Sequence, residues 1–148
     1  MQNVVLPTIN TIQEAIIEEF KTLDGDRERM LTYIMELGER LEPMHALHKS
    51  ENNIIKGCMS KVWLAHTRQH DRLFFTGDSN TAITKGLISL LFRVLSGQKQ
   101  EDIIRETLYF AGAIGMAQLI GPQRSSGFAN MVKEIKLIAI AQIAKQAV

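Results

Sequence analysis

The chain has 148 residues, which is long enough for a single domain with its own apolar core, and we expect one domain over residues 1–148. Hydrophobic residues make up 45% of it, which argues against disorder, and the 17 basic and 16 acidic residues leave a net charge of +1, which does not favour a nucleic-acid partner. The apolar runs are too short to span a bilayer and no basic signal segment opens the chain, so we expect a cytoplasmic protein with no membrane partner.

Two helices are predicted at the start of the chain. Apolar residues recur at helical spacing, first at Ile12, Ile16, Phe20 and Leu23, and then at Met30, Ile34, Leu37 and Leu41. Thr11 and Glu14 have the spacing of a capping box for the first helix. Pro43 ends the second helix, because the residue before a proline disfavours the α conformation. The polar residues 43–52 then predict a loop.

Three short antiparallel strands are predicted in the middle of the chain. Residues 54–55, 62–67 and 73–76 are rich in β-branched and aromatic side chains. The polar residues 68–71 predict the connection of a hairpin between the last two strands. Cys58 would then lie in the turn between the first and the second strand.

Helices are predicted again after the sheet. Gly77, Asp78 and Ser79 would end the sheet and cap a helix that ends near Gly97, with a buried face of Ile83, Leu87, Leu90, Leu91 and Val94. Gly86 within this helix indicates close packing against another backbone. Helical patterns follow at 102–108, at 116–120 and, after Gly121-Pro122, from about 128 to 145. The element order predicts an α+β fold with several helices packed against a small three-stranded sheet.

Cys58 is the single cysteine of the chain. It cannot form an internal disulfide, and one thiol is too few for a cysteine-rich metal or cluster site. Gly57 gives the backbone directly before it unusual freedom. From these residues alone two interpretations stay open, a buried inert thiol, which is the commoner case, and a reactive nucleophile.

Three blocks of residues resemble the sulfur acceptors of the SufE family, which includes the CsdE branch. The first block surrounds the cysteine: Asn53-x-x-x-Gly57-Cys58-x-Ser60-x-Val62-Trp63. The second is Gly77-Asp78-Ser79-x-x-x-Ile83-x-Lys85-Gly86-Leu87-Ile88, and the third is Pro122-x-Arg124-Ser125-x-Gly127-x-x-x-Met131. Tyr33-Ile34-x-x-Leu37-Gly38 with Leu41 resembles the first helix pair of the family, so the resemblance spans about residues 10–140.

The resemblance implies a fold shared with iron–sulfur scaffold proteins of the IscU type. It implies that the protein is not itself an enzyme, that it needs no cofactor, and that Cys58 accepts sulfur as a persulfide. The implied donor is a PLP-dependent cysteine desulfurase of the SufS or CsdA type, which the protein would stimulate. The implied recipient is an iron–sulfur scaffold complex, so the sulfur would serve cluster assembly.

Two side chains are expected to carry this chemistry. The Cys58 thiolate would attack the outer sulfur of the donor persulfide, and Ile54, Met59 and Trp63 are expected to shelter the thiol and keep it protonated at rest. Arg124, from its position in the third block, would support the sulfur anion electrostatically and lower the thiol pKa.

Other polar residues have plainer interpretations. Asp78 and Ser79 would cap a helix, Lys85 would be solvated, and the pairs His45/His48 and His66/His70 lack the carboxylate neighbours that favour a metal site, so we expect none. Two rival functions stay open. One is a cysteine hydrolase in which Cys58 is the nucleophile and His48 or His66 the base, and the other is a docking module with an inert thiol.

Overall fold

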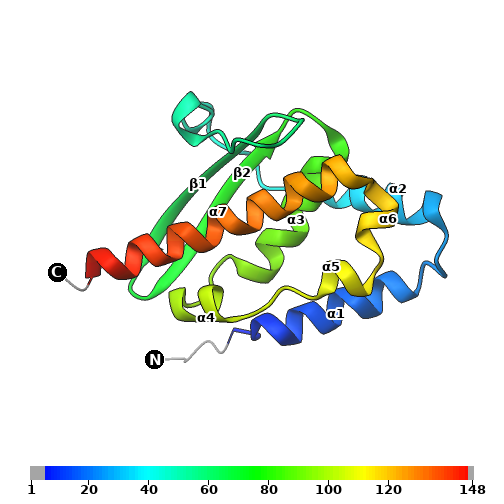
Figure 1. Ribbon diagram of the computed structural model, residues 1–148, viewed down its shortest axis with the longest axis horizontal. Coiled ribbons are helices and arrows are strands. Elements are labelled where there is room, and N and C mark those ends of the chain that lie inside the picture. The colour runs from blue at the N-terminus through cyan, green and yellow to red at the C-terminus, as the bar shows by residue number, and fades with distance from the viewer. Residues whose placement is uncertain (1–5, 147–148) are drawn as a thin grey trace.

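The computed structural model describes residues 6–146 and has the expected α+β architecture, with helices around a small antiparallel sheet (Figure 1). Helices α1 and α2 come first and two 3₁₀ turns follow them: α1 (Ile9–Lys21), α2 (Arg27–Glu39), η1 (Ala46–His48) and η2 (Glu51–Asn53). The hairpin strands are β1 (Val62–Gln69) and β2 (Arg72–Ser79). Five helices complete the described part of the chain: α3 (Ala82–Leu95), α4 (Gln100–Arg105), α5 (Phe110–Ala113), α6 (Met116–Ile120) and α7 (Pro122–Gln146).

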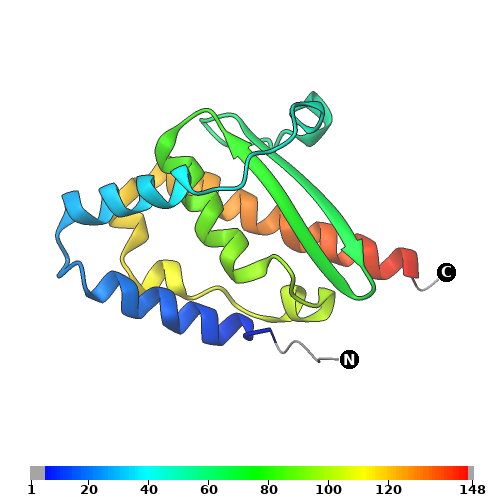
Figure 2. The same ribbon diagram turned by 180° about the vertical axis from the view of Figure 1, so that it is seen from behind.

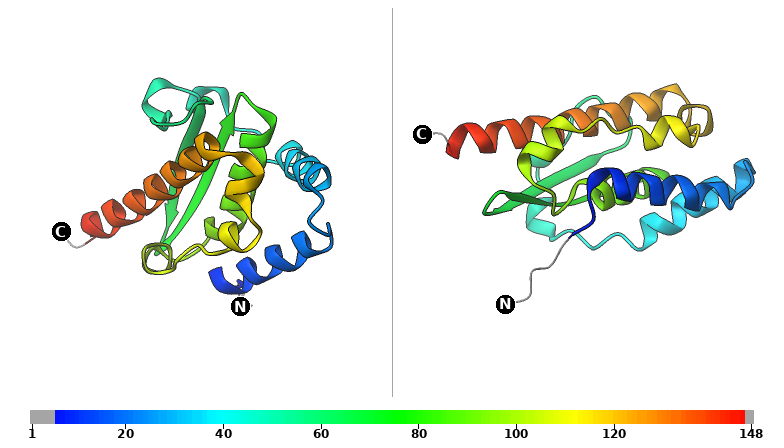
Figure 3. Two further views of the ribbon diagram at one scale, coloured as in Figure 1. Left: turned by 45° about the vertical axis from the view of Figure 1, so that its right-hand side comes forward. Right: turned by 90° about the horizontal axis from the view of Figure 1, so that it is seen from below.

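The two strands form the hairpin that the sequence predicted between them. They pair from Val62 opposite Ser79 to Gln69 opposite Arg72, and the two-residue turn between them holds His70 at φ 57°. Every second residue of β2 is buried, starting at Leu73. Helices α3 and α7 lie over one face of the hairpin, so these alternate residues enter the core between sheet and helices (Figures 1 and 3).

The prediction of three strands was wrong, because the sheet has two. Ile54 forms one isolated bridge with Trp63, and the Ile55 N–H donates to the Val62 carbonyl at 2.9 Å. The chain leaves η2 at Asn53 and turns at Gly57, whose φ is +84°, so too few residues are extended to build a ladder. The predicted first strand is therefore a short bridge that ties the cysteine loop to β1.

Several helix ends differ from the sequence prediction. Thr8 caps α1 in place of Thr11, by accepting a hydrogen bond from the Thr11 N–H. Thr81 stands at the N-cap of α3, while Asp78 and Ser79 belong to β2, so the capping role predicted for those two was wrong. Helix α7 begins at Pro122, six residues before the predicted start near 128. Proline suits a first helical position, since the N–H that it lacks would have no partner there.

Helices α2 and α3 cross at two glycines, which confirms the close packing predicted from Gly86 (Figure 2). A Cβ at Gly86 would overlap the Ile34 carbonyl oxygen, and a Cβ at Gly38 would lie 2.7 Å from the Gly86 nitrogen. No side chain larger than hydrogen fits at this crossing. It fixes α3, which carries one wall of the site described below.

A buried glutamine holds the segment before α5 against α1. The Gln13 side chain is completely buried and its amide oxygen accepts hydrogen bonds from the N–H groups of Tyr109 and Phe110, at 2.7 and 3.1 Å. Its amide nitrogen donates to the Thr107 carbonyl at 3.1 Å. The irregular backbone between α4 and α5 is thus satisfied by a side chain, as buried polar groups require.

Within residues 6–146, no helix has the length and the apolar character that crossing a bilayer demands.

Candidate functional site

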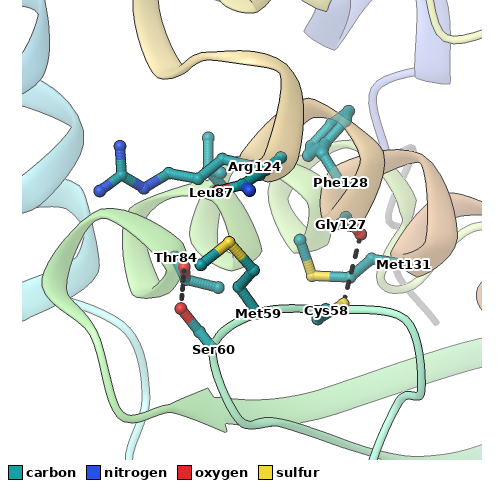
Figure 4. A pocket seen from close by; sticks show the side chains of 10 residues that line it. Cys58, Met59, Ser60, Thr84, Leu87, Arg124, Gly127, Phe128 and Met131 are labelled. Atoms are coloured by element: carbon teal, nitrogen blue, oxygen red, sulfur yellow. Dashed lines mark hydrogen bonds between the residues drawn. The ribbon is translucent and has the colours of Figure 1, made fainter.

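Cys58 lies in the short loop between the Ile54 bridge and β1, directly beneath the first turns of α7 (Figure 4). Its side chain is half-buried at the mouth of a small pocket. The pocket is lined by residues of the loop, of α3 and of α7: Cys58, Met59, Ser60, Thr84, Leu87, Gln123, Arg124, Gly127, Phe128 and Met131. The three sequence blocks singled out above thus meet at one place, around the single thiol.

A glycine of α7 lets the thiol approach the helix backbone. A Cβ at Gly127 would lie 3.5 Å from the Cys58 sulfur, and the thiol points at the Gly127 carbonyl oxygen, 3.6 Å away. An S–H is a weak donor, so this contact orients the thiol more than it holds it. Burial raises the pKa of the Cys58 thiol above its ordinary value, because the thiolate loses more hydration than the thiol does. The resting group is therefore a protonated thiol.

The shelter around the sulfur differs from the one predicted. Leu87, Phe128 and Met131 are the apolar wall residues, and all three are buried. Met59 touches the pocket, yet 75% of its surface is exposed. Trp63 borders a separate apolar cavity between the hairpin, α3 and α7. The predicted shelter was wrong for Ile54 and Trp63, while Met59 borders the pocket, and helix residues far away in sequence supply the buried part of the wall.

Side-chain hydrogen bonds hold both ends of the cysteine loop, and sequence reasoning had missed them. The Asn130 amide of α7 donates to the Gly57 carbonyl at 2.8 Å. At the other end, Ser60 and two threonines of the α3 start share a cluster of hydroxyls: Ser60 to Thr81 at 2.9 Å, Thr81 to Thr84 at 2.8 Å and Thr84 to Ser60 at 3.2 Å. The loop is thus a defined structure, closed over the pocket.

Arg124 lines the same pocket, on the first turn of α7. Its guanidinium donates to the Ile120 carbonyl at 3.3 Å and points away from Cys58 (Figure 4). Arg124 therefore lies in the wall near the sulfur without facing it. The expectation that Arg124 lowers the Cys58 pKa was wrong for this conformation, because burial raises that pKa.

Asp78 joins three elements next to the site. Its carboxylate lies 2.6 Å from the Lys49 ammonium and 3.5 Å from that of Lys85, and it accepts the Ser79 N–H. Burial alone would raise the pKa of Asp78, but these hydrogen bonds and charges keep it below its ordinary value. Lys85, which we expected to be solvated, has a side chain that is 42% exposed and also pairs with this carboxylate. The 43–53 segment, the hairpin and α3 are linked through it.

The histidines lie elsewhere. His45 accepts the Leu47 N–H at the start of η1, with His48 beside it, and His66 contacts Gln142 at 3.2 Å. His70 forms the hairpin turn. None of them lines the Cys58 pocket, and among residues 6–146 no group of three potential metal ligands is found.

Comparison with known proteins identifies the class of protein to which this site belongs. The SufE family, described as an Fe-S metabolism associated domain, matches residues 14–139. The chain belongs to this family, whose members are sulfur-transfer accessory proteins of iron–sulfur metabolism.

Curated relatives agree with this assignment. An uncharacterized SufE-like protein of Rhizobium meliloti is 32% identical over 131 residues, covering 85% of this chain and 93% of the relative. The SufE-like protein 1, chloroplastic/mitochondrial, of Arabidopsis thaliana is 36% identical over 86% of this chain, which spans only 35% of that longer protein. An uncharacterized SufE-like protein of Synechocystis is 31% identical over 85% of this chain and 79% of the relative.

A solved structure shares the fold. The solution structure of a hypothetical protein from Thermus thermophilus superposes with a TM-score of 0.74, covering 90% of this chain and 96% of that one. At 15% sequence identity, this likeness concerns the fold alone.

Proposed function

We propose that the protein takes sulfur from a PLP-dependent cysteine desulfurase onto Cys58, stimulates that enzyme and delivers the sulfur for iron–sulfur cluster assembly. The observation that carries the proposal is the position of Cys58. In a chain of the SufE family, its single thiol lies half-buried in a pocket where the loop, α3 and α7 meet. A desulfurase in the same compartment is the proposed partner, and we propose the cytoplasm as that compartment.

The transfer needs no redox agent. Cys58 loses its proton, and the thiolate attacks the terminal sulfur of the donor's cysteine persulfide. A new S–S bond forms on Cys58 as the donor's S–S bond breaks, and the donor cysteine leaves as a thiolate that can take up a proton. Sulfur moves from one persulfide to another, so oxidation states balance. The raised pKa of the buried thiol limits reaction with other electrophiles while no donor is present.

Arg124 is proposed to act on the sulfur anion once the loop has moved. A wider groove outside the inner pocket shares four of its lining residues: Met59, Ser60, Gln123 and Arg124. Residues 80–81 and 120–122 complete the lining of this groove. A sulfur that moves from pocket to groove would stay along the same arginine wall. A cation near a poorly solvated thiolate or persulfide stabilises the anion, and arginine keeps its charge throughout.

The two rival functions lack comparable support. A hydrolase needs a base within reach of the nucleophile, and the residues that line the Cys58 pocket include no histidine. A docking module with an inert thiol would not need Cys58 at a pocket mouth. Sulfur uptake from a desulfurase separates the relay from the hydrolase, and reaction of Cys58 with a thiol reagent separates both from a module with an inert thiol.

The deciding experiment is the intact mass of the protein after incubation with a type II cysteine desulfurase and cysteine. We expect one added sulfur atom, located on the peptide that contains Cys58 and removed by reducing agent. Cys58→Ser should gain none and should fail to stimulate cysteine turnover. No mass gain on the wild-type protein, or an equal gain on Cys58→Ser, would sink the relay proposal.

Variants of Arg124 test its electrostatic role. We expect sulfur acceptance to decrease from wild type to Arg124→Lys to Arg124→Ala, because lysine keeps the charge but loses the planar fork. Lys133→Ala is the matched control, since it removes an exposed cation of α7 that lies outside the pocket lining. Thermal stability should change little in all three. Wild-type acceptance in Arg124→Ala would show that the residue has no part in the transfer.

A further inference from the structure

We propose that Asn130 is a positioning residue that holds the cysteine loop closed, and that breaking its hydrogen bond to Gly57 is the step that exposes Cys58. The closed and open loop are features of the free protein, while their use in sulfur transfer rests on the proposed function.

The contact between Asn130 and the loop is specific in geometry. The Asn130 amide donates to the Gly57 carbonyl at 2.8 Å, across 73 residues of sequence. A Cβ at Gly57 would lie 2.5 Å from the Asn130 amide nitrogen, and the φ of Gly57 is +84°. Gly57 suits this position because its left-handed backbone disfavours other residues, and the Asn130 side chain lies against it. The asparagine covers the residue that precedes the thiol.

The loop is attached unequally along its length. On the β1 side, Ser60 joins the hydroxyl cluster, the Lys61 N–H donates to the Asn80 side chain at 3.0 Å, and the Asn80 N–H donates back to the Lys61 carbonyl. On the side before the loop, the Ile55 N–H bonds the Val62 carbonyl. These contacts belong to the hairpin and α3, so they can persist while residues 57–59 swing outward.

Two hydrogen bonds join residues 57–60 to α7 in the described part of the chain. One is the weak contact from the Cys58 thiol to the Gly127 carbonyl, and the other is the bond from Asn130. The Met59 side chain does little to hold the loop against α7, since most of its surface is exposed. Asn130 is therefore the strongest single attachment between the thiol loop and the helix that covers it.

Losing this bond should open the loop without unfolding the protein. Gly57 is exposed, so water can satisfy its carbonyl when the asparagine is absent. Local opening equilibria of this kind control the reactivity of half-buried groups. A net loss of one ordinary hydrogen bond shifts such an equilibrium by roughly two- to tenfold, and the alkylation rate of Cys58 should rise by the same factor.

The test compares Asn130→Ala and Asn130→Leu with wild type, in the free protein without a desulfurase. Leucine keeps nearly the size of asparagine but has no donor, so it separates the hydrogen bond from the bulk of the side chain. Lys133→Ala is the control on the same helix. The readouts are the rate of Cys58 alkylation by iodoacetamide at two pH values, and hydrogen exchange of residues 57–61.

We expect both variants to alkylate faster than wild type and Lys133→Ala at both pH values, with faster exchange confined to the loop and a melting temperature near that of wild type. Faster alkylation without faster exchange of residues 57–61 would overturn the proposal, because it would indicate a shifted thiol pKa while the loop stays closed. Wild-type alkylation and exchange in folded Asn130→Ala and Asn130→Leu would overturn the proposal. Because no sulfur donor is used, this outcome is independent of whether Cys58 accepts sulfur in the mass experiment.

Discussion

Replacing Gly86 with alanine tests the crossing that sets the position of α3. The added Cβ would overlap the Ile34 backbone carbonyl, which cannot move aside as the end of a flexible side chain can. Overpacking of a core costs about 1–3 kcal/mol, and a backbone contact places this site at the upper end. Alanine regains about 1 kcal/mol of helix propensity over glycine. We therefore expect Gly86→Ala to lower the free energy of unfolding by about 2 kcal/mol, which corresponds to about 4–8 °C in melting temperature for a domain of this size.

Gly112→Ala is the matched control for this substitution. Gly112 lies in α5 with an exposed side, and a Cβ there would meet no atom within 4 Å. The same chemical change should thus stabilise the protein by about 0.4–1 kcal/mol, through a less flexible unfolded chain. Urea unfolding followed by circular dichroism measures both variants. The reasoning about the crossing fails if Gly86→Ala matches or exceeds the stability of wild type, or if the two variants shift stability in the same direction.

Two further predictions concern the thiol and the buried glutamine. Because burial raises the pKa of Cys58, the pH midpoint of Cys58 alkylation should be higher in the native protein than in the urea-unfolded protein. The contribution of this thiol to stability is present below its pKa in the unfolded chain and is lost as pH rises through its pKa in the folded protein. A native alkylation midpoint at or below the unfolded midpoint would contradict this prediction. Gln13→Leu should destabilise the protein by about 2–4 kcal/mol in urea unfolding, since it removes the side-chain partner of the Tyr109 and Phe110 N–H groups and of the Thr107 carbonyl. A loss under about 1 kcal/mol would mean that water replaces the side chain.

Apolar periodicity predicted the helix faces well, because burial on a helix repeats along the sequence itself. Ile16, Ile34 and Leu87 are all buried where the pattern placed them, and Gly86 indicated the helix crossing. Helix ends and the third strand were predicted less well. The Ile54–Ile55 pair has strong β propensity, but Gly57 and the turn of η2 leave it room for a single bridge.

The site was predictable in its residue types more than in its contacts. The spacing around Cys58 indicated the family, whereas the apolar wall from Phe128 and Met131 and the hydrogen bond from Asn130 depend on how α7 crosses the loop. An asparagine within a helical pattern predicts only an exposed polar side chain. The sequence around Asn130 gives no indication that it contacts Gly57, 73 positions earlier. One signal existed, since Asn130 stands three residues after Gly127 and therefore on the same side of the helix.

That side of α7 explains how one thiol can be both protected and available. Arg124, Gly127 and Asn130 follow one another at intervals of three residues, so a single helix face brings a cation, a gap and a hydrogen-bond donor to the cysteine loop. Gly127 leaves room for the Cys58 sulfur in the closed loop, and the Asn130 amide donates a hydrogen bond to the loop. Arg124 lines both the inner pocket and the outer groove. Desolvation favours the neutral thiol inside, whereas water and, by our proposal, the arginine would favour the anion outside. Loop position alone would then switch Cys58 between a protonated thiol and a nucleophile, with no other titrating group required.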